Sequence, residues 1–593
     1  MLIKIMSVAH AKLSQIREGF YSLLLHEKSV VSVLLLMILG FLMLVPVWGI
    51  GIMHTDDALW YLALSEGKDA SADWAQSQGR IYALIVGKMM LYVLSLTGST
   101  YAEVLKYGSF SAVIVLYGAV IASYFNRNLA LLSLTLFIGL NAVRADGSVV
   151  FSYPLLIWPS LIAFALSMLA ARIYTRNGSV AWLVANALLL GFSMFTNEGI
   201  TFTLIILAAL AAVRNLVEIA GTRPQAWWYS SARSRGLIVA YVVPTGLYAL
   251  GYVAYLKLFP SMYDGSALTI LRPMDSIRTL ASFSFSGSFL YNIYQPYTIV
   301  FGEPGFHNGY NASYTVRIAM RDILSNPTAF IFGFISALVF GKIVFAIMSE
   351  DCLERKFNIR EFLAIIVGLL LAILPVILVA ISLKYIKWHT VQGIDSYATS
   401  VVSSFGVSMA LAGAMSLTFG WLPNMRMIKL PIFLVTIIVF GVCSALNHSI
   451  NERISSDLRA EGMRWDVFER GMQLMDAVGM EAELLSLPQF SRGSWYTATP
   501  SGYWSKLAKA RFEREVSIVD GPLLRADVAR TAVVSYETLG TRHTAVLVER
   551  MSLGPAGDPV IDEIAIDLGR NFDERLPPPV CPGSAPLRQI WFN

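Results

Sequence analysis

The chain has 593 residues, of which 56% are hydrophobic and only 14% are charged, and its formal net charge is +5. A soluble protein of this length would be built from several domains with charged surfaces, and so apolar a composition argues against that class. Many apolar runs are long enough to cross a bilayer, which takes about 20 residues per helix. The sequence therefore predicts a polytopic membrane protein, and its basic residues, gathered in short connections, give no reason to expect a nucleic-acid partner.

The first apolar run, Val30–Ile52, follows a basic segment that is too long and too mixed to be a cleaved signal peptide. We expect residues 1–29 to form a cytoplasmic N-terminus and this run to be a retained first span. The three cysteines, Cys352, Cys443 and Cys581, lie far apart and lack metal-ligand spacing. They support neither a disulfide framework nor a zinc site.

The first span delivers Asp56 and Asp57 to the outer face. The next apolar run, Ile81–Leu96, is about 16 residues long and carries Lys88, so it is short for a crossing. If it crossed, a group of arginines would lie outside, against the positive-inside rule: Arg172, Arg176, Arg214, Arg223, Arg233 and Arg235. We therefore expect this run to be a helix lying at the outer interface.

The remaining runs alternate across the membrane and give about eleven spans in all, with outer loops at 53–101 and 259–327. These spans are predicted at Ala102–Phe125, Leu129–Val143, Pro154–Ile173, Val180–Thr196, Ile200–Val213, Leu237–Leu258, Thr328–Met348, Phe362–Leu383, Ser400–Gly420 and Leu430–Leu446. No internal repeat indicates an inverted-repeat transporter.

From residue 447 the composition becomes that of an ordinary soluble domain, which this topology places in the periplasm. An amphipathic helix is expected at Trp465–Met480. Strand-like runs follow at Glu515–Val519, Thr531–Tyr536, Thr544–Glu549, Ile561–Leu568 and Leu587–Phe592. The predicted fold is thus mainly α, a transmembrane helix bundle at 30–446 with a small C-terminal α+β domain at 447–593. This domain has no phosphate-binding loop, so a structural or acceptor-docking role is favoured.

An acidic pair opens the first outer loop, in the stretch from His54 to Tyr61, and Gly79 and Arg80 follow further along. Carboxylates this close to a span are costly unless they face water or a polar cavity, so they are functional candidates. The alternative is that Asp56 and Asp57 are solvated and cap the positive end of the next helix.

Further polar groups reach the same face. They are Arg80, Lys88, Arg144, Asp146, Asn197, Glu198, Arg272, Arg278, Glu303, His307, Arg317, Lys384, Lys387 and His389. A transferase using a phospholipid carrier needs a carboxylate that takes a proton from the acceptor hydroxyl, and cations or a metal that neutralise the departing phosphate. Asp56 or Asp57 could be the base. We expect the substrate and phosphate group to be bound by Arg80, Lys88, Arg144, Asp146, Glu198, Arg272, Lys384, Lys387 and His389.

Each of these residues also has an ordinary structural interpretation. Lysines near span ends commonly anchor the interface, Glu198 can cap the next helix, and Asp146 before Gly147 suits a turn. His307 and His389 are of a type more often found as hydrogen-bonded or surface residues than as catalysts.

The arrangement resembles the GT-C superfamily of polyprenyl-phosphate-dependent glycosyltransferases. The segment from Asp56 to Tyr61 is similar to the acidic opening of their first outer loop. Gly79-Arg80 is similar to the element before their second juxtamembrane helix, and Leu96-Thr97-Gly98 with Glu103 is similar to the lead into the next span. The resemblance covers roughly residues 30–213 with any specificity.

The resemblance implies that Asp56 or Asp57 is catalytic and that Asp146 occupies a second acidic position. A divalent cation, Mg²⁺ or Mn²⁺, could then lie between Asp56, Asp57 and Asp146. The chain lacks the Lys-Pro-Pro element of the aminoarabinose transferases and the Trp-Trp-Asp element of oligosaccharyltransferases. The donor sugar, hexose or pentose, and the metal requirement therefore stay open.

The leading hypothesis is an inner-membrane glycosyltransferase that acts on the periplasmic face. It would move a sugar from a polyprenyl phosphate to a cell-envelope acceptor such as O-antigen or lipopolysaccharide, another lipid-linked glycan or a protein. One alternative is a flippase or transporter for a lipid-linked saccharide, which would need charged groups deep within spans. Another is an O-antigen polymerase or ligase, whose chemistry would rest on the loop from Arg272 to Arg317.

Overall fold

The computed structural model describes most of the membrane region and the core of the C-terminal sheet. The described residues are 27–52, 55–96, 99–143, 150, 152–153, 155–220, 232–262, 272–289, 321, 323–349, 359–392, 398–421, 426–479, 484–487, 502–520, 531–539, 543–553, 559–567 and 588–592.

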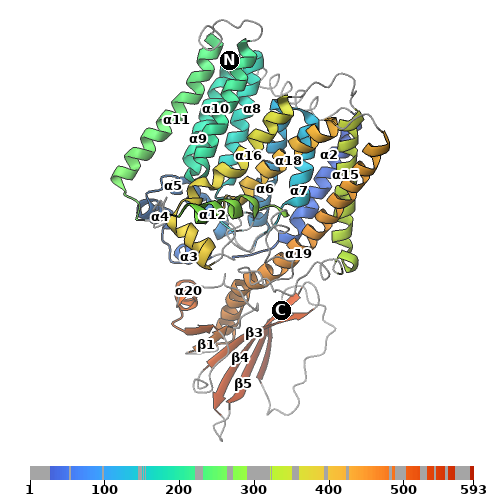
Figure 1. Cartoon of the computed structure of the whole chain (residues 1–593). Helices are drawn as coiled ribbons and strands as arrows, with labels where there is room; N and C mark the ends of the chain where they lie inside the picture. Colours follow the sequence, from blue (N-terminus) through green and yellow to red (C-terminus); the bar gives the residue numbers. More distant parts are fainter. Residues whose placement is uncertain are drawn as a thin grey trace, which may run out of the picture.

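Long apolar helices make up most of the described chain, and they pack side by side in one bundle (Figure 1). Within the described residues, eight helices are long and apolar enough to cross a membrane. They are α6 (Thr100–Tyr124), α8 (Trp158–Asn177), α10 (Glu198–Ala220), α11 (Ala232–Leu258), α15 (Pro327–Ser349), α16 (Ile359–Ala380), α18 (Ser400–Trp421) and α19 (Arg426–Val478). The chain is therefore a mainly helical, multi-pass membrane protein.

Four shorter helices are also apolar. They are α2 (Glu27–Leu44), α5 (Ala83–Ser95), α7 (Arg127–Leu140) and α9 (Val180–Thr196). The predicted total of about eleven spans would require all of these except α5 to cross as well.

Several boundaries differ from those predicted, and two of the differences have a clear physical cause. The first span was expected to run to Ile52, but α2 ends at Leu44 and a short 3-10 turn, η1 (Val45–Val47), follows. Pro46 has no backbone N–H to donate and fits only the first turn of a helix, which explains the break. The helices predicted at Leu430–Leu446 and Trp465–Met480 are instead one helix of 53 residues, α19. No proline interrupts residues 432–478.

Three short helices gather at the end of the bundle that faces the C-terminal region (Figure 1). They are α3 (Thr55–Ser65), α4 (Ala70–Gln78) and α5. Asp69 caps α4 by accepting the backbone N–H groups of Ser71 and Ala72. Gly79 ends α4 with φ 64°, and a Cβ there would lie 2.8 Å from the carbonyl oxygen of Phe259, so only glycine fits.

The C-terminal region forms a mixed six-stranded sheet in the order β2-β1-β3-β4-β5-β6. Its strands are β1 (Leu484–Leu487), β2 (Ser517–Asp520), β3 (Thr531–Leu539), β4 (His543–Leu553), β5 (Pro559–Asp567) and β6 (Arg588–Phe592). The end of α19 contacts β3, β4 and β5, and helix α20 (Tyr503–Phe512) contacts α3. Five of the six strands overlap the strand-like runs found in the sequence, and β1 was not predicted.

Helices α16 and α18 cross at two glycines. A Cβ on Gly406 would lie 2.2 Å from the backbone nitrogen of Ala372 and 2.5 Å from the carbonyl oxygen of Gly368. Small residues at such crossings let helix backbones approach closely within a membrane. Because backbone atoms fill the space, no side-chain adjustment can make room for a methyl group.

Replacing Gly406 with Ala is expected to force the two helices apart and to destabilise the protein by about 1–3 kcal/mol. Thermal unfolding of the purified protein in detergent measures this as a lower midpoint. Gly246 in α11 is a matched control, because a Cβ there meets nothing within 4 Å. Gly246→Ala should leave the midpoint unchanged or slightly higher. Equal midpoints for the two variants would contradict the role given to this crossing.

Candidate functional site

The acidic pair lies in the first turn of α3, and both carboxylates bind Tyr153. Both oxygens of Asp57 accept the backbone N–H of Tyr153, at 3.1 and 3.0 Å. The Tyr153 hydroxyl donates to Oδ2 of Asp56 at 2.7 Å. Asp57 is 2% exposed, whereas Asp56 is exposed to solvent. Negative charge is favourable in the first turn of a helix, as the capping interpretation requires. The two carboxylates also bind Tyr153, which lies in a segment far away along the chain.

That segment has an unusual backbone. Tyr153 has φ 49° and Leu155 has φ 65°, the left-handed region that residues other than glycine seldom adopt. Such conformations cost free energy and persist only where the surroundings hold them. Here the two hydrogen bonds from Tyr153 to Asp57 and Asp56 supply that restraint. The position of the exposed Asp56 carboxylate is thus tied to a strained and specific arrangement.

The link between the first span and α3 is fixed by charged groups of α6. The Lys106 ammonium is buried and donates to the carbonyl oxygen of Ile50 at 3.4 Å and to Oε1 of Glu103 at 3.2 Å. The other Glu103 oxygen accepts the N–H of Gly49 at 3.0 Å. These contacts hold the chain just before α3, and so the helix that carries the acidic pair starts from a defined place.

Burial raises the pKa of Asp57 to about 7. Desolvation is the largest cause, and the neighbouring charge of Asp56 acts in the same direction. The Tyr153 N–H and the Lys106 charge oppose it. Asp57 therefore changes its protonation state near neutral pH, while it holds the segment that orients Asp56.

Aromatic rings form a wall beside the pair. Trp74 makes edge-to-face contacts with Trp60 at 4.8 Å and with Tyr82 at 5.4 Å between ring centroids. Tyr153 packs against the same cluster. The Arg80 guanidinium donates to the Tyr82 hydroxyl at 3.3 Å. Arg80 is therefore held next to the cluster that packs against Tyr153, on the same side of the bundle as the acidic pair.

Helix α3 is also clamped by the C-terminal region. The Tyr503 hydroxyl of α20 donates to the carbonyl oxygen of Ala58 at 3.0 Å. The Tyr61 hydroxyl donates to Glu469 of α19 and accepts from Arg511 of α20 at 2.7 Å. Arg511 also pairs with Glu469 at 3.3 Å. The helix that carries the acidic pair is thus held in place by α19 and α20, whose contacting residues lie more than 400 positions away along the chain.

A second basic group lies on α17 (Leu383–Lys387) and η3 (Trp388–Gln392). The Lys384 ammonium lies 5.1 Å from the centroid of the Trp388 ring, and His389 makes an edge-to-face contact with Phe283. Phe283 belongs to α12 (Pro273–Phe285), which packs against α16, α17 and η3. The two elements that carry Lys384, Lys387 and His389 therefore lie against α12, whose N-cap is Arg272.

Other predicted site residues have different positions. Lys88 pairs with Asp69, the N-cap of α4, at 3.8 Å, and both side chains are largely exposed. Glu198 is the first residue of α10. Neighbouring Asn197 is buried and donates to the carbonyl oxygen of Leu156 at 2.9 Å. The predicted site residues outside the described part of the chain are Arg144, Asp146, Glu303, His307 and Arg317.

The described residues do not fit a divalent cation. Both oxygens of Asp57 face a backbone N–H, a donor group that takes the place a metal would need. The exposed carboxylate of Asp56 accepts the Tyr153 hydroxyl through Oδ2. In the described part of the chain, no group of three or more metal-binding side chains comes together. Asp146 lies outside the described residues.

Sequence reasoning missed the residues that organise the pair. No role was predicted for Tyr153, which precedes a proline between two apolar runs. Lys106 and Glu103 are spaced i, i+3 at a span end, a pattern that indicates a buried ion pair. Nothing local in the sequence marks Tyr503, Arg511 or Glu469 as partners of α3.

No family model matches the chain, and no curated protein matches it in sequence. Its fold is similar to the Archaeoglobus fulgidus oligosaccharyltransferase in the apo form, with a TM-score of 0.32 and 11% identity over 83% of this chain and 64% of that one. It is also similar to ArnT from Cupriavidus metallidurans bound to undecaprenyl phosphate, with a TM-score of 0.32 and 12% identity over 87% of this chain and 97% of that one.

A third similar structure is archaeal AglB from Archaeoglobus fulgidus in complex with an inhibitory peptide and a dolichol-phosphate, at a TM-score of 0.30 and 11% identity. Its match covers 83% of this chain and 64% of that one. At TM-scores of 0.30 to 0.32 and identities of 11–12%, these are loose likenesses of fold. The chain spans less than two thirds of the length of the oligosaccharyltransferase.

The buried Asp57 should make stability fall as pH rises. Its pKa is about 7 in the folded protein against an ordinary value of 3.8. Between about pH 4 and pH 7 the folded state holds a proton that the unfolded chain has released, so folding weakens through this window, by up to roughly 4 kcal/mol. The thermal midpoint of the wild type should therefore drop from pH 5 to pH 8.

Asp57→Asn, which keeps the shape without the titration, should remove most of this drop. Asp56→Asn is the matched control, because that side chain is exposed, and it should retain the drop. The assignment fails if Asp57→Asn and the wild type show the same dependence of midpoint on pH.

Loss of the clamp should misplace α3. Arg511→Ala removes one contact to Tyr61 and one to Glu469. We expect the turnover rate to fall about tenfold to hundredfold, because a shift of about 1 Å in the position of a reacting group has an effect of this size. Lys509→Ala on the same helix breaks only an exposed pair with Glu515, so its activity should match the wild type. Equal activity of both variants would show that the clamp does not position α3.

Proposed function

We propose that the chain is an integral membrane glycosyltransferase that moves a sugar from a polyprenyl-phosphate carrier to an acceptor hydroxyl. The observation that carries this proposal is the acidic pair at the end of the bundle, with one carboxylate exposed and the other buried, and both bonded to Tyr153. A solvent-facing carboxylate with a fixed orientation is what a general base requires.

Asp56 is the proposed general base. Its exposed oxygen takes the proton of the acceptor hydroxyl as that oxygen attacks the anomeric carbon of the donor. The bond from this carbon to the phosphate oxygen breaks, and the phosphate leaves with the electron pair. Asp57 is a positioning residue, because its buried carboxylate cannot reach an acceptor. It holds Tyr153, whose hydroxyl in turn orients Asp56.

Cations near the pair are the proposed partners of the departing phosphate. Arg80 lies beside the aromatic cluster that packs against Tyr153. Its planar guanidinium can donate two parallel hydrogen bonds to a phosphate, which a lysine cannot do. Lys384, Lys387 and His389 are the second set, because α12 and α17 bring them together. Donors already in place cost no reorganisation as negative charge develops on the leaving oxygen.

The proposed orientation puts the acidic pair and the C-terminal region in the periplasm of a cell with an inner membrane. Arginines at the opposite helix ends support it, since cytoplasmic ends carry the positive charge. These arginines include Arg127, Arg172, Arg176, Arg214, Arg233, Arg235 and Arg360. We propose about eleven spans and a cell-envelope glycan, lipid or protein as the acceptor.

The membrane-embedded charges favour this function over a flippase. Lys106 pairs with Glu103, and Arg172 pairs with Glu218. Each pair therefore has a structural role in its own helix contacts, whereas a transport path would need charged groups open to a passing ligand. The polymerase or ligase alternative would place its chemistry in the loop between Arg272 and Arg317 and would not need Asp56.

Asp56→Asn and Asp57→Asn separate these functions. Loss of the base should lower transfer by about 10²–10⁴-fold, whereas Asp57→Asn should impair transfer through the position of Tyr153. The assay follows the release of polyprenyl phosphate from undecaprenyl-phosphate hexoses and pentoses in membranes that carry the protein. Asp73→Asn is the matched control, because Asp73 is an exposed first-turn aspartate of α4. Full activity of both Asp56→Asn and Asp57→Asn would refute the proposal.

A further inference from the structure

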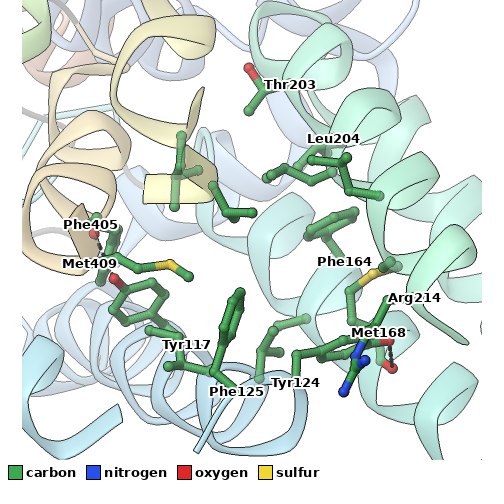
Figure 2. Close-up of a pocket in the computed structure, with 18 of the residues that line it drawn as sticks. Tyr117, Tyr124, Phe125, Phe164, Met168, Thr203, Leu204, Arg214, Phe405 and Met409 are labelled. Carbon is green, nitrogen blue, oxygen red and sulfur yellow. Dashed lines mark hydrogen bonds between the residues drawn. The ribbon is translucent and has the colours of Figure 1, made fainter. Parts of the chain in front are cut away.

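A large cavity lies inside the helix bundle, at a place that the proposed reaction does not use. Its volume is about 660 Å³, and its walls come from α6, α8, α10, α16 and α18 (Figure 2). Most of the lining is apolar, with side chains such as Phe164, Met168, Phe405 and Met409. The size and the lining are those of a site for an apolar ligand.

Water is a poor occupant of this space. A buried water needs roughly two to four polar partners, and the lining offers few such groups. The Tyr117 hydroxyl already donates to the carbonyl oxygen of Phe405, and the Tyr124 hydroxyl already donates to that of Met168. The cavity is therefore suited to hydrocarbon, which also surrounds the outer faces of helices that cross a membrane.

The cavity is open at one end and closed at the other. Near Arg214, apolar lining residues of α10 and α16 are 41% to 63% exposed, namely Leu210, Val213, Val217, Ile359 and Leu363. Figure 2 shows Thr203 and Leu204 at the end away from Arg214. Lining residues of that end are at most 2% exposed, namely Ile200, Thr203, Leu204 and Val402. A chain can thus enter between α10 and α16, but it cannot pass through.

The open end lies far from the acidic pair. Helix α10 starts at Glu198, where the preceding Asn197 bonds to Leu156, a residue of the aromatic cluster beside the pair. Arg214 comes sixteen residues after Glu198, which is about 24 Å along a helix. A carrier with its phosphate at the acidic pair would therefore have its tail at the closed end of the cavity.

The volume also distinguishes between the lipids of a membrane. At roughly 30 Å³ for a group the size of a water molecule, which is close to the size of a methylene, the cavity holds on the order of twenty such groups. One acyl chain of a phospholipid comes close to that number of carbons, whereas a polyprenyl carrier has far more. Size and the place of the open end therefore favour the same occupant.

We propose that this cavity holds one acyl chain of a bilayer phospholipid. The chain enters between α10 and α16, passes Ala211 and ends near Leu204, while the headgroup stays outside in the leaflet next to Arg214. It supplies the packing contacts that α10 and the α16–α18 pair lack across the cavity. This site is separate from that of the sugar donor, and its occupancy does not depend on the proposed glycosyl transfer.

The position of the chain is tested by photo-crosslinking of the purified full-length protein in nanodiscs. The nanodiscs contain phosphatidylcholine and a trace of phosphatidylcholine with a diazirine at the end of one acyl chain. Peptide mass spectrometry should find crosslinks on Leu204 and Val402 at the closed end. It should also find them on Leu250 of α11, which is 71% exposed and reports ordinary contact with lipid. Crosslinks confined to outward-facing residues would overturn the proposal.

Filling the cavity gives a matched pair of variants. Ala211→Phe places a ring inside it, while Ala209→Phe places the same ring on an exposed position of α10 outside the lining. Ala211→Phe should lose the crosslinks to Leu204 and Val402 and keep those to Leu250, and Ala209→Phe should keep all of them. Ala165→Phe fills the cavity from α8 and should give the same loss, so the test does not depend on the folding of one variant.

The source of the chain is tested by competition in the same nanodiscs. Undecaprenyl phosphate, added at several times the mole fraction of the diazirine lipid, should leave the crosslinks to Leu204 and Val402 unchanged. A selective loss of these crosslinks would assign the cavity to the polyprenyl carrier and overturn the proposal. Equal crosslinking of the closed end in Ala211→Phe and Ala209→Phe would also overturn it.

Discussion

The structure of the site depends on one interaction, the hydrogen bonding of the Asp57 carboxylate to the backbone N–H of Tyr153. The two residues are 96 positions apart, so this contact joins the helix after the first span to the segment before α8. Removing a carboxylate from water is unfavourable, and the single N–H together with the Lys106 charge offsets only part of that cost, which is why the pKa stays raised. The unfavourable burial of Asp57 occurs next to the strained backbone of Tyr153. Both unfavourable free energies therefore fall on the residues that hold the Asp56 carboxylate in a fixed direction.

The C-terminal region belongs to the same site. Helix α19 runs from the membrane into this region without a break, and its residue Glu469 meets Tyr61 and Arg511 beside the acidic pair. Burial, reinforced by the neighbouring Glu469, raises the pKa of Tyr61, so its hydroxyl remains a donor over the whole working range of pH. A ligand that moves α20 would therefore also move α3. This gives the C-terminal region a physical route to influence the position of the acidic pair.

Much of the fold could be predicted from the sequence, because apolar runs and helix ends are local features. Val180–Thr196 was predicted with the bounds that α9 has. The boundaries that failed depend on context: Pro46 ends α2 early, and α19 continues past residue 447 although its surroundings change from lipid to water. A composition change marks a change of solvent and need not mark a change of secondary structure.

The site was only partly predictable, for a related reason. The acidic pair stands out because charge beside a span is costly, and that is visible in sequence. Its partners are not visible, because Tyr153 and Tyr503 meet α3 only through contacts between segments far apart along the chain. Lys88 has a partner that the sequence did not indicate, because it pairs with Asp69. A shared face limits which residues can meet, but packing decides which do.

The short helix α5 connects these observations to the polarity of the whole bundle. Its 13 residues extend about 20 Å, less than the roughly 30 Å of a hydrocarbon core. It packs with α3 and α4 at one end of the bundle, where Gly87 leaves room for Trp60. Arg176 near the end of α8 and Arg235 near the start of α11 lie at the other end of the bundle from the acidic pair (Figure 1), as the predicted topology requires.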